Sequence, residues 1–122
     1  MDAMRDRRTN VIAVIFEVTP TAEGKPQYLE TAAELKQYLS SIKGFISVER
    51  FQSLTDSNKI LSLSFWDDEQ SIQEWRNLSA HRAAQQAGRE QLFADYRIRV
   101  AGVIRDYSIE NRAEAPADSQ HI

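Results

Sequence analysis

The segment EWRNLSAHRAAQQAGR, residues 74–89, concentrates side chains that could bind or transform a small molecule. It holds the indole of Trp75, the imidazole of His81 and guanidinium groups that include Arg76 and Arg89. An imidazole can act as a base or a metal ligand, and a guanidinium can pair with a phenolate, a carboxylate or a developing oxyanion. The competing interpretation is an ordinary helix with an ordinary polar face.

His81 is the first of two histidines in the chain, and the second lies at position 121. If Ser79 caps a short helix, His81 lies in its first turn, where the helix dipole disfavours the charged imidazolium. A neutral imidazole could then act as a base, a hydrogen-bond partner or a metal ligand, so His81 is predicted to be catalytic. The alternative is a half-buried histidine bonded to a backbone group or to a dimer partner.

Aromatic side chains are predicted to wall a site for a flat ligand, because such ligands stack on aromatic rings. The residues given this role are Trp66, Trp75, Phe93 and Tyr96. Trp75 is also placed in the catalytic group with His81. The alternative is that the tryptophans fill the core and that Tyr96 packs under the helices.

Two arginines flank the histidine segment. Arg76 is predicted to be catalytic and Arg89 to bind substrate, each as a cation that stabilises an anion. Each has a structural alternative: Arg76 can pair with neighbouring acidic residues, and Arg89 follows Gly88 and can satisfy carbonyls at a helix end. Exposed ion pairs contribute only about 0–1 kcal/mol.

Composition narrows the classes of function. With 122 residues, no cysteine and a net charge of −3, one domain is expected, thiol chemistry is excluded and no nucleic-acid partner is predicted. No apolar run approaches the ~20 residues of a membrane span, and no signal peptide is recognised, so a cytoplasmic protein is expected. Phosphate loops and the GxSxG and HExxH motifs are absent, and no spacing predicts a metal site.

Hydrophobic periodicity predicts four strands and two helical regions. Strands are expected at residues 11–18, 45–54, 59–66 and 95–107. A helix is expected at residues 27–42, with Gly44 as a left-handed cap. A second helical region starts after the acidic residues at 67–69 and is expected to divide at Ser79 and to end at Gly88.

The order β-α-β-β-α-β predicts a ferredoxin-like α+β fold, a four-stranded antiparallel sheet with helices on one face. The first strand is apolar on both faces, so a second copy of the sheet is expected to cover the other face in a two-fold homodimer. Arg97 and Arg99 share a strand face on which they can meet Glu17 or Glu49. The domain is expected at residues 10–109, between a flexible N-terminus at 1–9 and a disordered tail at 110–122.

The stretches GFISVERF, LSLSFWDDE, WRNLSAHRAAQQAGR and YRIRVAGVIRDY resemble the antibiotic biosynthesis monooxygenase family of small dimeric α+β barrel proteins. The resemblance runs from about residue 11 to residue 107. It is most detailed at Trp75, Arg76, His81, Gly88, Arg89 and Tyr96. The family includes cofactor-free oxygenases of anthrones or quinols, haem-degrading oxygenases and members of unknown activity, and a shared fold does not imply a shared reaction.

The haem-degrading members place an asparagine on the first strand, a tryptophan, and a histidine ligand on the helix. Trp75 fits the tryptophan, but the ligand position then falls nearer Gln85 than His81. The first strand offers Phe16 or Glu17 where the asparagine would lie, and the chain's Asn10 comes too early. The haem site is only partly reproduced, so no bound cofactor is expected.

The resemblance implies a small monooxygenase-type oxidoreductase without a bound organic cofactor, whose aromatic, phenolic or quinol-like substrate supplies the electrons. His81 or Arg76 would stabilise a phenolate, the tryptophans and Phe93 would wall the ring, and Tyr96 would orient it. One alternative is a non-catalytic dimeric module that binds or senses small hydrophobic molecules. A haem-degrading monooxygenase is the weaker alternative.

Overall fold

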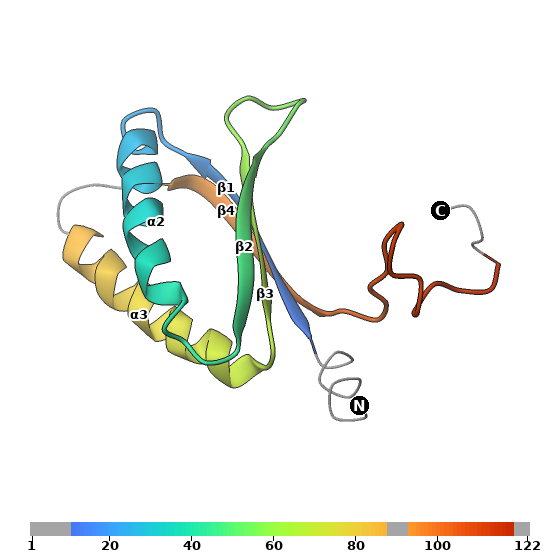
Figure 1. Ribbon diagram of the computed structural model, residues 1–122. Helices are drawn as coiled ribbons and strands as arrows, with labels where there is room; N and C mark the ends of the chain where they lie inside the picture. The colour runs from blue at the N-terminus through green and yellow to red at the C-terminus, as the bar shows by residue number, and fades with distance from the viewer. Residues whose placement is uncertain (1–10, 88–92, 119–122) are drawn as a thin grey trace.

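The computed structural model describes residues 11–87 and 93–118, and for residues 79–87 it describes the helix but not the side chains. The elements are β1 (Ile12–Pro20), α2 (Lys25–Leu39), β2 (Phe45–Gln52), β3 (Ile60–Trp66), α3 (Glu69–Ala87) and β4 (Phe93–Gly102). The strands form one antiparallel sheet in the order β2-β3-β1-β4, and both helices lie on one side of it (Figure 1). The predicted ferredoxin-like fold is confirmed.

The first helix is fixed at its start by proline and a local hydrogen bond. Pro26 lies in the first turn of α2, where its missing N–H costs no helical bond. The Gly24 N–H donates to Thr21 Oγ1 at 2.8 Å just before the helix. The helix then ends at Leu39, three residues earlier than predicted, and its buried face carries Tyr28, Ala32, Leu35 and Leu39.

The second helix is continuous from Glu69 to Ala87, so the predicted division at Ser79 is wrong. Serine caps a helix only where the chain leaves helical geometry, and the alanines after Ser79 favour a continued helix instead. The residue that caps α3 is Asp68, whose Oδ1 accepts the Ser71 N–H at 2.8 Å and lies 2.7 Å from the Ser71 hydroxyl. Only two residues, Asp67 and Asp68, separate β3 from the helix.

Gly44 has a φ of +99°, as its predicted left-handed conformation requires, but it lies five residues beyond Leu39 and does not cap α2. It is needed where the turn before β2 meets the start of α3. A Cβ at this position would lie 2.0 Å from Ser71 Oγ. The Ser71 hydroxyl is also 2.6 Å from the Lys43 carbonyl, and the Asp67 N–H donates to the Gly44 carbonyl at 2.7 Å. These contacts hold the start of α3 against the sheet.

The last strand ends at Gly102 instead of continuing to residue 107. Gly102 pairs with Ile12, the first residue of β1, and among the described residues the pairing continues only as far as the Val103 N–H, which donates to the Val11 carbonyl at 2.9 Å. Residues 103–118 form turns held by local bonds, such as Ser108 N–H to the Asn111 carbonyl at 2.8 Å. The predicted flexible N-terminus, residues 1–9, and residues 119–122 of the predicted disordered tail lie outside the described residues.

Two apolar clusters fill the space between helices and sheet. One contains Leu39, Ile42, Trp66 and Ile72, with Trp75 packed beside it. The other contains Val18, Tyr28 and Ile60, with Phe16 and Phe93 beside it. On β3, alternate residues face the helices, so Ser62 and Ser64 lie between Ile60 of one cluster and Trp66 of the other.

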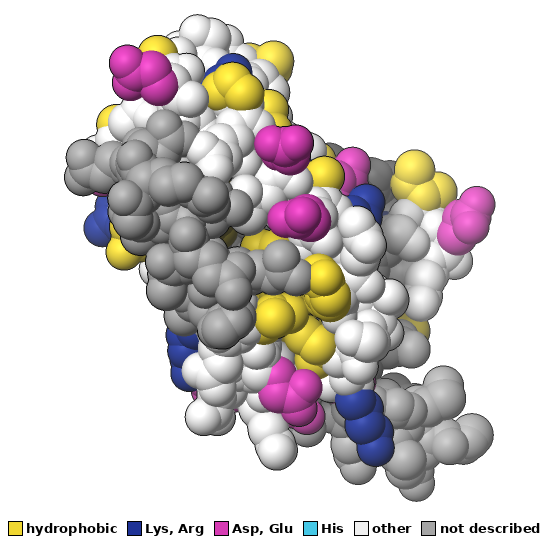
Figure 2. Space-filling view, turned by 90° about the vertical axis from the view of Figure 1, so that its left-hand side faces the viewer, with side chains coloured by type: hydrophobic (Ala, Val, Ile, Leu, Met, Phe, Trp, Pro, Cys, Tyr) yellow, Lys and Arg dark blue, Asp and Glu magenta, His cyan; other side chains and the backbone are white. Residues whose placement is uncertain are grey.

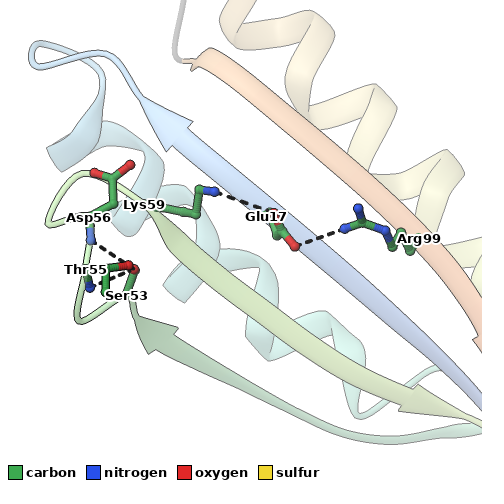
Figure 3. Close-up of polar contacts among 6 residues, drawn as sticks. All are labelled: Glu17, Ser53, Thr55, Asp56, Lys59 and Arg99. Carbon is green, nitrogen blue, oxygen red and sulfur yellow. Dashed lines mark hydrogen bonds and ion pairs between the residues drawn. The ribbon is translucent and has the colours of Figure 1, made fainter.

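The opposite side of the sheet, called here the helix-free face, bears no helix or strand of the described residues (Figure 1). On the two central strands its side chains are mainly apolar and include Ala13, Ile15, Leu61, Leu63 and Phe65, whereas the edge strands place charged residues on it, among them Glu49 and Arg97. On this face the carboxylate of Glu17 lies between two cations: its Oε1 is 3.7 Å from Lys59 Nζ, and its Oε2 is 3.0 Å from Arg99 Nη1 (Figure 3). The predicted meeting of Arg99 with Glu17 is thereby confirmed.

Candidate functional site

Four aromatic side chains, called here the aromatic cluster, gather on the helix-facing side of the sheet. They are Phe16 of β1, Tyr28 of α2, and Phe93 and Tyr96 of β4. The ring of Phe93 has its centroid 6.0 Å from that of Phe16, 5.6 Å from Tyr28 and 5.9 Å from Tyr96. The predicted site residues Phe93 and Tyr96 therefore lie in one aromatic surface.

The aromatic cluster runs from the core to the solvent. Tyr28 is 7% exposed, whereas Tyr96 is 58% exposed, and the next helix-facing residues of β4, Ile98 and Val100, are 53% and 52% exposed. They pair with Val18, Phe16 and Val14 of β1, whose side chains pack under the helices. An apolar strip on β4 thus adjoins buried rings, which is the combination that holds flat apolar ligands.

Seen from the helix side, apolar side chains gather near the middle of the molecule, with acidic side chains above and below them (Figure 2). Small-molecule sites are lined mainly by hydrophobic and aromatic side chains, so this apolar area is a candidate ligand surface.

Trp66 and Trp75 belong to the other end of the molecule. Trp66 is fully buried, its ring packs edge-on against Phe45 at 5.3 Å, and its indole N–H donates to Ser64 Oγ at 2.8 Å. Trp75 is half-buried and packs against the same apolar cluster. This arrangement favours the core-filling interpretation for Trp66 and separates both indoles from Phe93 and Tyr96.

The remaining predicted site residues lie on or after α3. Arg76 is exposed on the helix surface. His81 lies well beyond the first turn of α3, which begins at Glu69, so the expected influence of a helix N-terminus on His81 has no basis. The side chain of His81 and all of Arg89 lie outside the described residues.

At the N-terminus of α3, the perturbed carboxyl group of Asp68 has a structural role as a helix cap. The Ser71 N–H, and then the Ser71 hydroxyl, hold the pKa of Asp68 below its ordinary value of 3.8 because they bond to its ionised form. Asp68 lies before the helix and is exposed. The shift therefore marks a helix cap, far along the chain from the aromatic cluster.

Three residues that face the interior between the sheet and the helices were not identified as site residues from the sequence. Phe16 lies in a strand that is apolar on both faces, so alternation could not assign its side. Tyr28 was expected on the buried face of its helix without a role. Arg50 follows Val48 by two residues on β2, and its Nε is buried with no hydrogen-bond partner among the described residues. An arginine two residues after a partly buried valine, and therefore on the same face of the strand, is the signal that could have identified it.

Haem and metal chemistry gain no support from the described side chains. Among them, no three of the potential metal ligands His, Asp and Glu come together. They also include no imidazole, because His81 and His121 fall outside them. The helix positions considered for a haem ligand, Gln85 and His81, have side chains outside the described residues, so no step is assigned to haem. Among the described residues, no helix is long and apolar enough to span a membrane.

Comparison with known sequences identifies relatives over most of the chain. Residues 11–87 match the model of the antibiotic biosynthesis monooxygenase family. The chain is 43% identical over 93 residues to "Jasmonate monooxygenase ABM" from Pyricularia oryzae, covering 76% of this chain and 43% of the relative. It is 32% identical over 93 residues to YqjZ, an uncharacterised protein of Bacillus subtilis, covering 76% and 79%. The chain thus spans less than half of the fungal relative.

Solved structures show the same fold at low sequence identity. SnoaB from Streptomyces nogalater, a cofactor-independent oxygenase, superposes with a TM-score of 0.61 at 14% identity, covering 80% of this chain and 96% of that one. MhuD, with two manganese protoporphyrin IX molecules bound per active site, gives a TM-score of 0.63 at 14% identity, covering 80% and 98%. From the family match and the sequence relatives, the chain belongs to the antibiotic biosynthesis monooxygenase family.

Proposed function

We propose that this protein is a monooxygenase that uses no bound organic cofactor and oxidises an aromatic, phenolic or quinol-like small molecule. The observation that carries the proposal is the aromatic cluster, which joins buried rings to an exposed apolar strip on β4. Phe93 and Phe16 would stack against the substrate ring, and Tyr96 would orient it from the solvent side. Membership of the family and its monooxygenase relative support the reaction class.

The chemistry requires an electron-rich substrate. A methylene group activated by a neighbouring phenolate can react with dioxygen to give a carbonyl group and water, so the substrate supplies all four electrons. One oxygen atom enters the product and the other leaves as water. The protein's tasks are to hold the ring, stabilise the phenolate and exclude bulk water. His81 and Arg76 remain the predicted anion-stabilising residues on α3.

The jasmonate monooxygenase relative favours a second candidate substrate, a small alicyclic carboxylate. Hydroxylation of a saturated carbon consumes two more electrons than the substrate provides. Such a reaction would therefore depend on an external reductant, and this requirement distinguishes it from quinol oxidation.

The helix-free face supports a homodimer. An apolar sheet surface that includes Ile15, Leu61 and Leu63 is of the kind that soluble proteins cover, and a second copy of the sheet offers a matching surface. A non-catalytic binding module would use the same dimer and the same aromatic cluster.

Oxygen uptake by the purified protein tests the proposal. With an anthrone or naphthoquinol and no added haem or reductant, we expect uptake above the spontaneous rate that saturates with substrate. Phe93→Ala should lower the rate, because it removes the ring at the centre of the cluster. Binding without oxygen uptake would favour the binding module, and activity that requires haemin would favour the haem-degrading alternative.

A further inference from the structure

Among the described side chains, a single buried nitrogen or oxygen atom lacks a hydrogen-bond partner, and it is the Nε of Arg50. Buried polar groups in folded proteins are nearly always hydrogen-bonded, and an unpaired one belonging to a charged group is costly. Arg50 also takes part in neither of the ion pairs found among these residues, which join Glu17 to Lys59 and Arg99. The guanidinium is therefore held in place without an acceptor for one of its donors.

Arg50 faces the helices. It follows Val48 by two residues on β2, and Val48 packs against the cluster that contains Leu39 and Ile72. On the four described strands, every helix-facing position other than that of Arg50 is uncharged. The buried face of α2 is uncharged as well. The counter-charge for Arg50 is thus absent from the strands and the helix described around it.

The pairing register places Arg50 at one end of a row across the sheet. Arg50 pairs with Ser62, Ser62 with Phe16, and Phe16 with Ile98. Directly paired residues share a face, so the row passes from a cation through a hydroxyl to an aromatic ring and an aliphatic end. With neighbouring strands about 4.8 Å apart, the row is roughly 14 Å long. That length suits a molecule of one to three rings.

Small side chains lie beside the cation. Ser62 and Ser64 separate the two apolar clusters on β3, where larger residues would have joined them. The Ser64 oxygen accepts the Trp66 N–H, which leaves the Ser64 hydrogen free to donate. A guanidinium with neighbouring hydroxyl groups is the donor set that recognises a carboxylate or phenolate oxygen.

We propose that Arg50 anchors the oxyanion of a small apolar acid, whose ring system extends over Phe16 toward the aromatic cluster. This inference rests on the proposed function and narrows its substrate class to apolar molecules that carry a carboxylate or phenolate. Arg50, which sequence did not single out, takes the anion-binding role on the β2 side of the row. Its role is to bind and position the substrate.

Calorimetric titration with naphthalene-1-acetate and with its methyl ester tests this assignment, because the two probes share their rings and differ in charge. We expect the native protein to bind the acid at least about tenfold more tightly than the ester, equivalent to about 1.4 kcal/mol. Arg50→Met should abolish that preference, and Arg50→Lys should restore part of it. Arg105→Met removes an exposed cation after β4 and should leave the preference intact.

Equal affinity for acid and ester, or no binding of the acid at millimolar concentration, would overturn the proposal. So would an Arg50→Met protein that keeps the preference. The melting temperature of the ligand-free protein separates a structural role from a binding role. Removing an unpaired buried donor should leave the melting temperature unchanged or raise it, and a clear decrease together with an unchanged preference would make Arg50 structural.

Failure of the Arg50 proposal can be distinguished from failure of the proposed monooxygenase function. Acid binding that depends on Arg50 without any oxygen uptake would support the anchor and contradict the monooxygenase. Oxygen uptake with a phenolic substrate that Arg50→Met leaves unchanged would support the monooxygenase and contradict the anchor.

Discussion

Tyr96 is the side chain whose position most directly suggests contact with a ligand. Its ring packs against Phe16 and Phe93 at 5.9 Å, while 58% of the residue is exposed. Ring contacts hold the side chain in place, and the exposed part leaves its hydroxyl able to reach a ligand. Trp66, in contrast, uses its polar atom within the core.

We expect Tyr96→Phe to lower kcat/KM about tenfold while leaving the melting temperature nearly unchanged. The variant keeps the ring contacts and removes only the hydroxyl, and one hydrogen bond to a charged group contributes about 1.5–3 kcal/mol. Steady-state kinetics and thermal unfolding provide the two readouts. Tyr107→Phe, after β4, is the matched control and should change neither, because it keeps the ring that Arg112 lies over. Unchanged kinetics for Tyr96→Phe would remove Tyr96 from the site.

Asp68 gives the protein a predictable response to acid. Because its pKa is lowered in the folded state, its contribution to stability is complete above the ordinary value of 3.8 and is lost as pH falls through the lower folded value. Asp68→Asn keeps an acceptor at the helix cap but removes the titration. We expect the variant's melting temperature to fall less steeply than the wild type's below about pH 4.

The junction between the turn before β2 and the start of α3 determines how the second helix lies on the sheet. Gly44 combines a φ of +99° with no room for a Cβ next to Ser71. We expect Gly44→Ala to destabilise the protein by about 2 kcal/mol or more, because a left-handed conformation alone costs a non-glycine residue about 1–2 kcal/mol.

Gly102→Ala is the matched control for that variant, because a Cβ at Gly102 would meet nothing within 4 Å. Denaturant unfolding of both variants gives the comparison. Equal stability of the two would show that the Gly44–Ser71 contact does not constrain the start of α3.

The elements were predictable where periodicity was unambiguous and less so at their ends. Strict alternation identified β2 and β3, and a 3.6-residue period identified α2. The division at Ser79 was wrong because serine is tolerated inside helices as well as favoured at caps. The excess length predicted for β4 arises because apolar residues 103 and 104 continue the strand pattern, although the regular pairing with β1 ends at Gly102 and Ile12.

The candidate site was predictable in part for a related reason. Tyr96 lies within the strand predicted at residues 95–107, Phe93 begins β4 just before it, and the structure brings the two rings together. The tryptophans were assigned to the same site because residue type cannot tell a buried indole from an exposed one. Phe16 and Arg50 depend on which side of the sheet the helices cover, and that is a property of the tertiary fold.

At the scale of the whole molecule, the helix-free face predicts self-association. Leu63 lies on this face, paired with Ile15 and Glu49. We expect the native protein to sediment as a dimer and Leu63→Arg to weaken the dimer by about 2 kcal/mol or more, because a charge would be buried at the interface. Leu29→Lys on α2, where the residue is 42% exposed, is the control. A native protein that sediments as a monomer at all concentrations would refute the dimer.

The proposed reaction requires the substrate itself to supply the electrons for oxygen activation. The most direct measurement is turnover of a quinol or anthrone under ¹⁸O₂ by protein freed of haem, without reductant, followed by mass spectrometry of the product and of the water formed. The proposed function predicts one ¹⁸O atom in the product and one in water for each dioxygen consumed. Product that carries no ¹⁸O, or turnover only when a reductant or haem is added, would contradict it.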